Sequence, residues 1–400
     1  MKKYILILIL NGLILSCNPK QERQSIDLII DIEELEEIKI TPGNFIKNST
    51  YIQLETNENC LIGNNIEKLV VKDNQIFILD SNNKIFVFDT NGTFLNTIGE
   101  KGGGPNEQLS IVSFYVHPIK KYIAIFDILR QTVFKYSYNG ILLDKIKYDN
   151  SISEFYDVDL LSDENKLVLT TYNEPRNKYE YLLVDEENMK LERKVFPYLA
   201  TNNVSMKYGF PRVTMVQDTC FILTQYSDIV QKYHNNNINP YLLVSTHLKQ
   251  INKNTKFSGR NETGTILDFD SNLKKDNYSL GLEQILSTDE YLYLLYNNYH
   301  KNKIYHIFRD LQYNQNFSIT LDKEFYKYPI ADIVSFGNFK ASTNKYFVAV
   351  FMLRDGFKEV NEDIISENES IKEIRSEFEE DGNPIIVFIN IQQIVQDARK

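Results

Sequence analysis

Short apolar runs alternate with clusters of turn-forming residues along almost the whole chain after residue 25. Stretches with helical periodicity are scarce, and the apolar runs are rich in β-branched and aromatic residues, with 26 Tyr and 24 Phe. Such runs, bounded by turn residues, are typical of β-strands, and regularly spaced short strands indicate a sandwich, a barrel or a propeller. The pattern therefore predicts an all-β fold and leaves three architectures open.

An internal repeat decides among these architectures. Apolar runs ending at Asp80 and Asp127 begin two matching units, and each continues through a second apolar run to an Asn-Gly pair that ends in Gly92 or Gly140. Asn-Gly favours a tight hairpin turn between two strands. Four-stranded units that repeat at roughly 40–50 residues are typical of propeller blades.

Weaker copies of the unit follow, and the chain is predicted to form a six-bladed β-propeller with four-stranded antiparallel blades. The expected strands of the later blades start at 155 and cover 166–171, 179–185 and 190–196 in the third, 213–216, 220–225, 229–233 and 240–246 in the fourth, 280–286, 291–296, 304–308 and 316–321 in the fifth, and 331–336, 346–353 and 384–391 in the sixth. The last blade lacks its outer strand, which we expect residues 50–55 to supply. This N-terminal strand would close the ring and remove an exposed sheet edge.

Several motifs within this pattern resemble a known group of proteins. They lie at 51–56, 61–63, 76–80, 88–92, 98–107 and 381–388. With them the chain resembles the NHL-like and TolB-like six-bladed β-propeller lipoproteins of Bacteroidota. The similarity covers nearly the whole mature chain and is strongest over 50–145 and at the C-terminus, although the fourth blade is irregular and Asn106 replaces a usual glycine. Because the function of that family is largely undefined, the resemblance implies a fold but little chemistry.

The first sixteen residues carry the features of an export signal. Lys2 and Lys3 precede an apolar run at 4–10, which is too short to cross a bilayer, and Ser16 directly precedes Cys17. A small residue before a cysteine at this place resembles the lipobox of bacterial lipoproteins, which implies cleavage before Cys17 and acylation of its sulfur and its new amine. Several acyl chains give lasting attachment to a lipid bilayer. The alternative is an ordinary signal peptide with an incidental cysteine.

This interpretation divides the chain into a signal peptide at 1–16, a lipidated cysteine with a polar tether at 17–25, and a propeller at 26–400. The expected location is the cell envelope, anchored in the outer membrane, with either the periplasmic side or the cell surface open. Cys60 and Cys220 are expected on roughly opposite sides of the ring as small buried side chains, and a disulfide between them, which needs a close approach, is the alternative.

Charge and motifs exclude several classes of function. The net charge is −10, no region concentrates Lys and Arg, and loss of the signal peptide leaves about −12, so a nucleic-acid backbone would be repelled. The five histidines show no zinc-ligand spacing, and no GxSxG, HExxH or Cys-His arrangement is present. Because Trp is absent, the repeat boxes of sialidases and WD40 proteins are excluded. No catalytic residue, metal site or cofactor is predicted.

The order of strands predicts a single functional face. If the strands of a blade are lettered A to D from the axis outward, the B–C loops and the D–A connections emerge on the same face. The long connections are all of these kinds and cover 99–110, 197–209 and 247–279 between blades and 172–178, 297–303 and 354–383 within blades. Insertions that gather on one face of a repeat fold usually mark its binding surface.

Seven residues are candidates for ligand binding on this face. They are Lys101, Glu107, Asp80, Asp127, Arg130, Arg176 and Arg354. The glycine-rich segment 99–107 lacks the ending of a phosphate-binding loop and joins strand to strand, so a tight turn with positive φ is expected instead. The two aspartates end their strands, where they could face a ligand or bind the backbone of a turn.

The segment 354–383 is an acidic insert in the last blade. Its charge pattern predicts a solvated flap with an amphipathic helix after Ser370. A docking surface for a basic partner and a weak calcium site are the alternatives.

Two functions remain open. The first is a monomeric, membrane-anchored binding or scaffold module that recognises an envelope protein, a peptide or a glycan with its loop-rich face. The second is a lactonase-like, metal-dependent hydrolase or a lyase with its site at the central channel, which rests on analogy between propellers.

Overall fold

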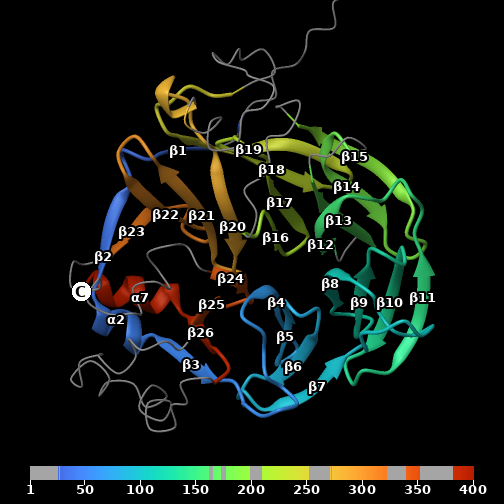
Figure 1. Ribbon diagram of the computed structural model, residues 1–400. Helices are drawn as coiled ribbons and strands as arrows, with labels where there is room; N and C mark the ends of the chain where they lie inside the picture. The colour runs from blue at the N-terminus through green and yellow to red at the C-terminus, as the bar shows by residue number, and fades with distance from the viewer. Residues whose placement is uncertain are drawn as a thin grey trace, which may run out of the picture.

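Six β-sheets stand around a common axis and form a closed ring (Figure 1). The computed structural model describes residues 26, 28–161, 165–172, 177–198, 210–251, 271, 273–321, 339–351 and 382–400. Each sheet contains four antiparallel strands that follow the expected order from the axis outward. The predicted six-bladed β-propeller is confirmed.

The first five blades are continuous in sequence and begin with their inner strands. Blade 1 is β4 (Ile66–Lys72), β5 (Gln75–Asp80), β6 (Ile85–Asp89) and β7 (Phe94–Ile98), and blade 2 is β8 (Ile111–His117), β9 (Tyr122–Asp127), β10 (Thr132–Ser137) and β11 (Leu142–Lys147). Blade 3 is β12 (Phe155–Leu161), β13 (Lys166–Thr171), β14 (Tyr179–Asp185) and β15 (Leu191–Pro197). Blade 4 contains β16 (Val213–Val216), β17 (Thr219–Leu223), β18 (Ile229–His234) and β19 (Asn237–Ser245), and blade 5 contains β20 (Leu282–Ser287), β21 (Tyr291–Asn298), β22 (Lys303–Asp310) and β23 (Asn316–Leu321).

The middle strands of the blades are covered on both faces by neighbouring blades, which explains their continuous apolar runs. All six residues of β9 are buried, whereas all six residues of the outer strand β11 are partly or fully exposed. Buried apolar side chains form a cluster at each of the six junctions between blades. Cys60 lies at the junction of blades 6 and 1, and Cys220 lies opposite, at that of blades 3 and 4. Both are buried and free, as predicted.

The Asn-Gly turns are tight, but they differ from a two-residue hairpin turn. Only the glycines Gly92 and Gly140 have positive φ, at +90° and +80°. In the first turn the Gly92 amide donates to the Asp89 carbonyl, and the Asp89 amide donates to the Thr93 carbonyl. The strand register also shifts beside the turn. The turn therefore ends in a β-bulge whose glycine takes the left-handed conformation.

The sixth blade joins the two ends of the folded chain. It is ordered β24 (Phe339–Ser342), β25 (Phe347–Phe351), β26 (Ile385–Ile389) and β3 (Ser49–Gln53). The pairing of β3 with β26, with Thr50 opposite Phe388, confirms the predicted closure. The prediction of 331–336 as the inner strand of this blade was wrong. The inner strand is β24, and 331–336 lies outside the described residues. With only four residues, two of them polar, β24 gives a weak apolar signal.

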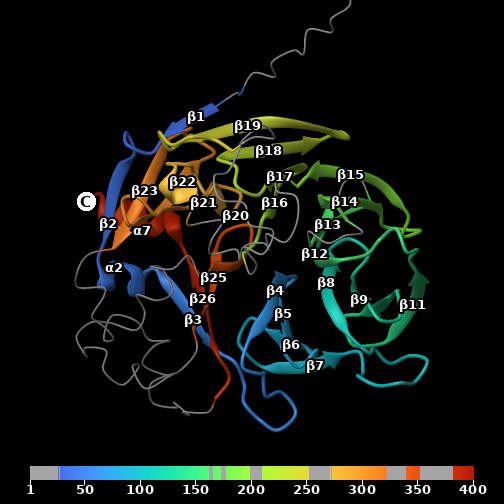
Figure 2. The same ribbon diagram turned by 45° about the horizontal axis from the view of Figure 1, so that its top comes forward.

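The chain reaches blade 6 along the outer rim, which the sequence did not predict. The strand β1 (Leu28–Asp31) pairs in parallel with β19, and β2 (Glu36–Ile40) pairs in parallel with β23. Blades 4 and 5 therefore have a fifth strand each. Figure 1 and Figure 2 show these blue strands outside the ring. We call residues 28–53 the N-terminal belt.

Two short helices pack beside the belt. Thr41 caps α2 (Pro42–Lys47) and Asn390 caps α7 (Ile391–Ala398), each through its side chain. The Asn44 side-chain amide of α2 donates to the Ile394 carbonyl of α7 at 2.9 Å. The helix predicted after Ser370 lies outside the described residues. Within the described ranges, no helix combines the length and the apolar character needed to cross a membrane.

Candidate functional site

A cavity of about 1250 Å³ lies on the axis of the ring. All six inner strands contribute to its wall. Turns that follow the inner strands of blades 5, 6 and 1 line one end, and Tyr172, Phe210 and Pro211 line the other. The second end belongs to the predicted functional face, because the B–C loops and D–A connections lie there.

Six polar side chains gather in the wall of this channel, and we call them the channel group. They are Glu67 and Lys68 of β4, Ser113 of β8, Asp157 and Asp159 of β12, and Lys340 of β24. Each lies within the first five residues of its inner strand. Since these strands begin at the predicted functional face, all members of the channel group except Asp159, the fifth of seven residues in β12, lie in the half of the channel nearest that face.

Lys68 connects blade 1 to blade 3. Its Nζ donates to Asp157 Oδ1 at 2.6 Å and to the Val158 carbonyl at 2.5 Å, and Ser113 Oγ donates to the same Asp157 oxygen at 2.9 Å. Burial would lower the pKa of Lys68, but the charges of Asp157 and Asp159 outweigh it and raise the pKa. Lys68 therefore stays an ammonium, committed mainly to Asp157.

Asp159 is less well compensated than Asp157. Its Oδ1 lies 3.7 Å from Lys68 Nζ, and 32% of its side chain remains exposed within the channel. Burial raises the pKa of Asp159 to about 7, because the attraction of Lys68 offsets only part of the desolvation and Asp157 adds repulsion. The neutral form of this carboxyl group is therefore favoured more than in an exposed aspartate.

Lys340 lies on the opposite wall, because blade 6 is the third blade from blade 3 in the ring of six. Burial lowers the pKa of Lys340, while the charge of Glu67 acts in the other direction. Within the parts of the chain that the structure describes, no carboxylate lies within 4 Å of its Nζ and no hydrogen bond joins it. Lys340 thus presents an ammonium group to the channel without a direct partner.

Asp80 and Asp127 are buried in turns. The carboxylate of Asp80 accepts hydrogen bonds from the amides of Gly63, Asn82 and Lys84 at 2.9–3.0 Å. Asp127 accepts from three backbone amides in the same way, at 2.7–3.0 Å. The sequence left open whether these aspartates face a ligand or bind the backbone of a turn, and in the structure both bind turn backbone.

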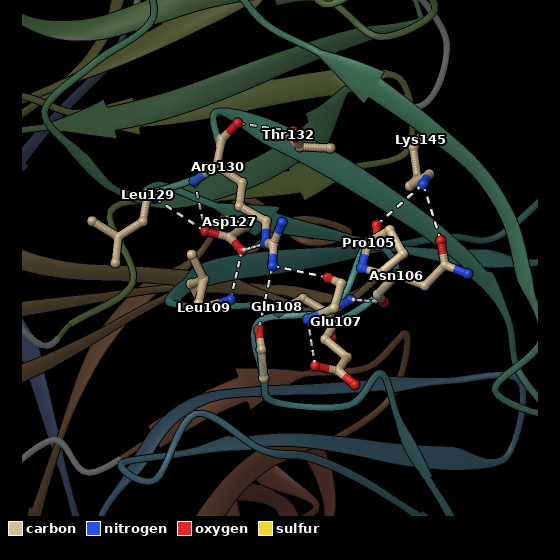
Figure 3. A network of polar contacts seen from close by, with 12 residues as sticks. Pro105, Asn106, Glu107, Gln108, Leu109, Asp127, Leu129, Arg130, Thr132 and Lys145 are labelled. Atoms are coloured by element: carbon tan, nitrogen blue, oxygen red, sulfur yellow. Dashed lines mark hydrogen bonds and ion pairs between the residues drawn. The ribbon is translucent and has the colours of Figure 1, made fainter.

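Arg130 and Glu107 hold the glycine-rich loop together (Figure 3). The Arg130 guanidinium lies beside Asp127 and donates to the Gly104 carbonyl at 2.9 Å. Glu107 accepts a hydrogen bond from the Gly104 amide at 2.7 Å. Lys101 is exposed, with its Nζ 3.5 Å from the Asn82 carbonyl. Of these three candidates, Lys101 has the side chain most open to a ligand.

Positive φ occurs at only one glycine of this loop, Gly99, at +76°. Gly102 and Gly104 leave room for the observed position of the Glu107 side chain: a Cβ atom would lie 2.0 Å and 2.9 Å from its carboxylate. A Cβ atom at Gly103 would meet nothing within 4 Å. The expectation of positive φ was therefore right for Gly99 and wrong for the other three, two of which make space for Glu107.

Three further candidates, Cys17, Arg176 and Arg354, lie outside the described residues, as does the acidic insert except for its last two residues. Their predicted roles remain predictions. Within the described ranges, no three His, Cys, Asp or Glu side chains are grouped as a metal site requires.

Two buried acids were missed. Glu186, at the junction of blades 2 and 3, accepts hydrogen bonds from Tyr115 Oη and Lys135 Nζ, both at 2.7 Å, and from Tyr122 Oη. Burial would raise its pKa, but Lys135 and the tyrosines outweigh that effect and hold it at about 2. Glu186 lies between two other acidic residues, Asp185 and Glu187, in a turn, so its sequence resembles a solvated loop.

The second buried acid, Glu180, lies at the junction of blades 3 and 4, toward the predicted functional face. It accepts a hydrogen bond from the Gln225 amide at 2.8 Å. Burial raises the pKa of Glu180 to about 7, and the charge of Arg212 opposes this change. The rings of Tyr156 and Tyr172, which line the channel close by in blade 3, lie 5.1 Å apart. Nothing in the sequence joins these residues, which come from two strands and three connecting segments.

The fold and the channel group define a six-bladed β-propeller with a polar, charged cavity on its axis. The chain belongs to the DUF4934 family, a domain of unknown function, which matches residues 24–390. A candidate exported protein of Bacteroides fragilis has a similar structure, with a TM-score of 0.63 and 19% identity over 91% of this chain and 99% of that one. A DUF4221 family member from Bacteroides vulgatus has a TM-score of 0.51 and 12% identity over 86% and 95%. No curated protein matches the sequence.

Proposed function

We propose that this protein is a monomeric, lipid-anchored binding protein of the cell envelope that holds part of a protein, a peptide or a glycan in its axial channel. The observation that carries the proposal is the channel group, which places charges of both signs in a cavity of about 1250 Å³. A cavity with a few convergent polar groups is the default ligand site of a protein. Because charges in a confined space are costly to leave without partners, a ligand that pairs with them is favoured.

The proposed anchor is Cys17 in the outer membrane. It is supported by the charged and apolar start of the chain, by Ser16 before Cys17, and by the similar fold of a candidate exported protein. We also propose kinship with the NHL-like and TolB-like lipoproteins of Bacteroidota. Replacing Cys17 with alanine should move the protein from the detergent phase to the aqueous phase in a detergent partition assay. Equal partition of the variant and the native chain would contradict lipidation.

The binding proposal can be tested with peptide and glycan arrays. We expect the native chain to capture a defined set of ligands and Lys340→Met to lose most of that capture. Lys345→Met is the matched control, because Lys345 lines the other end of the channel, where its Nζ lies 5.2 Å from the centre of the Tyr346 ring. Equal capture by both variants would place the ligand outside the channel group.

A second candidate function is a hydrolase or lyase, as the sequence left open. Asp159 favours it, because a carboxyl group with a pKa of about 7 in an accessible cavity is suited to general acid–base catalysis. Turnover of lactones, esters or uronic-acid glycans, lost in Asp159→Asn while ligand binding persists, would support an enzyme. A metal analysis of the purified chain would test the metal dependence.

A further inference from the structure

We infer that the channel group receives a zwitterionic ligand, such as a short peptide with free ends, whose ammonium group faces Asp159 and whose carboxylate faces Lys340. This inference rests on the proposed binding function and names the class of ligand. It is carried by the unequal pairing of charges on two opposite walls of one cavity.

The wall formed by β12 has more carboxylates than ammonium groups. Asp157 and Asp159 extend from the same face of the strand, since they are two residues apart. Lys68 is the cation beside them, and its close contacts go to Asp157 and the Val158 carbonyl. At 3.7 Å, Asp159 has only a long ion pair, and part of its surface faces the channel. A second ammonium group at that surface would complete the pairing.

The opposite wall offers an ammonium group instead. Lys340 Nζ has no carboxylate within 4 Å among the residues that the structure describes. Glu67, on the neighbouring strand β4, is an acid whose charge acts on Lys340 without a direct contact. A ligand carboxylate would make the direct ion pair that Glu67 does not make. Glu67 would repel that carboxylate, so it is expected to limit the affinity.

Ligands with one sign of charge fit the channel less well. A polyanion would meet Asp157, Asp159 and Glu67, while a polycation would meet Lys68 and Lys340. A single cation would pair with Asp159 only, and a single anion would pair with Lys340 only. Because hydrogen bonds to charged groups are stronger than those between neutral groups, each satisfied end is expected to improve affinity at least about tenfold.

The test uses dialanine and its three capped forms, titrated calorimetrically into the full chain in mild detergent. We expect dialanine to bind at least about tenfold more tightly than the N-acetylated form, which lacks the ammonium group, or the amidated form, which lacks the carboxylate. The form capped at both ends should bind most weakly. In Asp159→Asn, N-acetylation should no longer matter, and in Lys340→Met, amidation should no longer matter.

Glu67→Gln gives a gain of affinity that a damaged fold cannot imitate. It should tighten binding of the probes that keep a free carboxylate and leave the amidated probes unchanged. The inference is overturned if all four probes bind equally, if none binds at millimolar concentration, or if the variants change all affinities alike. Array capture that depends on Lys340 but ignores end capping would overturn the ligand class and leave the proposed function standing. Failure of every array ligand to bind would overturn the proposed function itself.

Discussion

Replacing Glu186 with glutamine should destabilise the junction between blades 2 and 3. The native carboxylate is fully buried and accepts hydrogen bonds from Tyr115, Tyr122, Lys135 and Lys120. The substitution keeps the shape of the side chain but leaves the Lys135 ammonium, whose side chain is only 11% exposed, without its anion. Breaking one partner of a buried ion pair costs about 3–5 kcal/mol.

The pKa of Glu186 gives a second route to the same magnitude. Its value of about 2 lies below the ordinary 4.5, so the folded state favours the ionised form. This difference corresponds to about 3 kcal/mol of stability, which is fully present above pH 4.5 and is lost as the pH falls from 4.5 toward 2. The Glu186→Gln variant cannot lose this contribution. Its stability should therefore fall less steeply than that of the native chain over this interval.

The assay is urea unfolding of residues 26–400 at pH 7 and at several pH values below 5. Glu187→Gln is the matched control, because Glu187 is the next residue, is 67% exposed at its side chain and lies 3.7 Å from Lys120. An exposed pair of this kind contributes less than about 1 kcal/mol. If Glu186→Gln unfolds within 1 kcal/mol of the control at pH 7, the argument for a buried ionic clamp is refuted.

Three further predictions concern ring closure, a turn and the channel. Asn383→Ala should lower the free energy of urea unfolding by about 2–4 kcal/mol, because this buried side chain makes three short hydrogen bonds to the backbone around the entrance to blade 1. Gly92→Ala should lower the free energy of thermal unfolding by about 1–3 kcal/mol, because its Cβ atom would lie 2.1 Å from the Gln53 carbonyl oxygen. The control Gly103→Ala should leave this free energy unchanged, because a Cβ atom there meets nothing within 4 Å. Asp159→Asn should be more stable to urea than the native chain at pH 8 and equally stable at pH 4. The reason is that the raised pKa of Asp159 makes its ionisation in the folded state costly as the pH rises from about 4 to 7. Equal stability of the two chains at pH 8 would contradict this prediction.

The blades could be predicted from sequence because their middle strands are buried on both faces. A strand such as β9 must be apolar at every position, so the repeat of apolar runs and turn glycines reports the architecture directly. The belt could not be predicted in the same way. Its strands are short, β2 begins within an acidic segment, and the strands that they join lie more than 200 residues further along the chain. Among the belt strands, only the closing strand β3 could be predicted, because the sixth blade lacked an outer strand in the sequence pattern.

The channel group was also beyond the sequence, although one part of it left a signal. Lys68 and Asp157 are 89 residues apart, and their contact depends on the distance between blades around the ring. No local spacing encodes that distance. Asp157 and Asp159, however, alternate with Val158 in an inner strand, so two acids on one face of an otherwise apolar blade could have indicated a charged wall. Asp80 and Asp127 drew attention instead because they recur in the repeat, and their repetition reflects a turn that each blade needs.

The belt determines how an anchor at Cys17 would act on the ring. The tether would join the folded chain at β1, on the rim of blade 4, two blades before the closing strand β3. A pull on the tether would therefore load the ladder between β1 and β19 first, then the one between β2 and β23, before it reached β3. Exposed pairs such as Lys301–Glu33, with a distance of 2.6 Å, add little on their own. If the chain is anchored at Cys17, the parallel backbone ladders would carry the load and would shield the strand that closes the ring from the attachment.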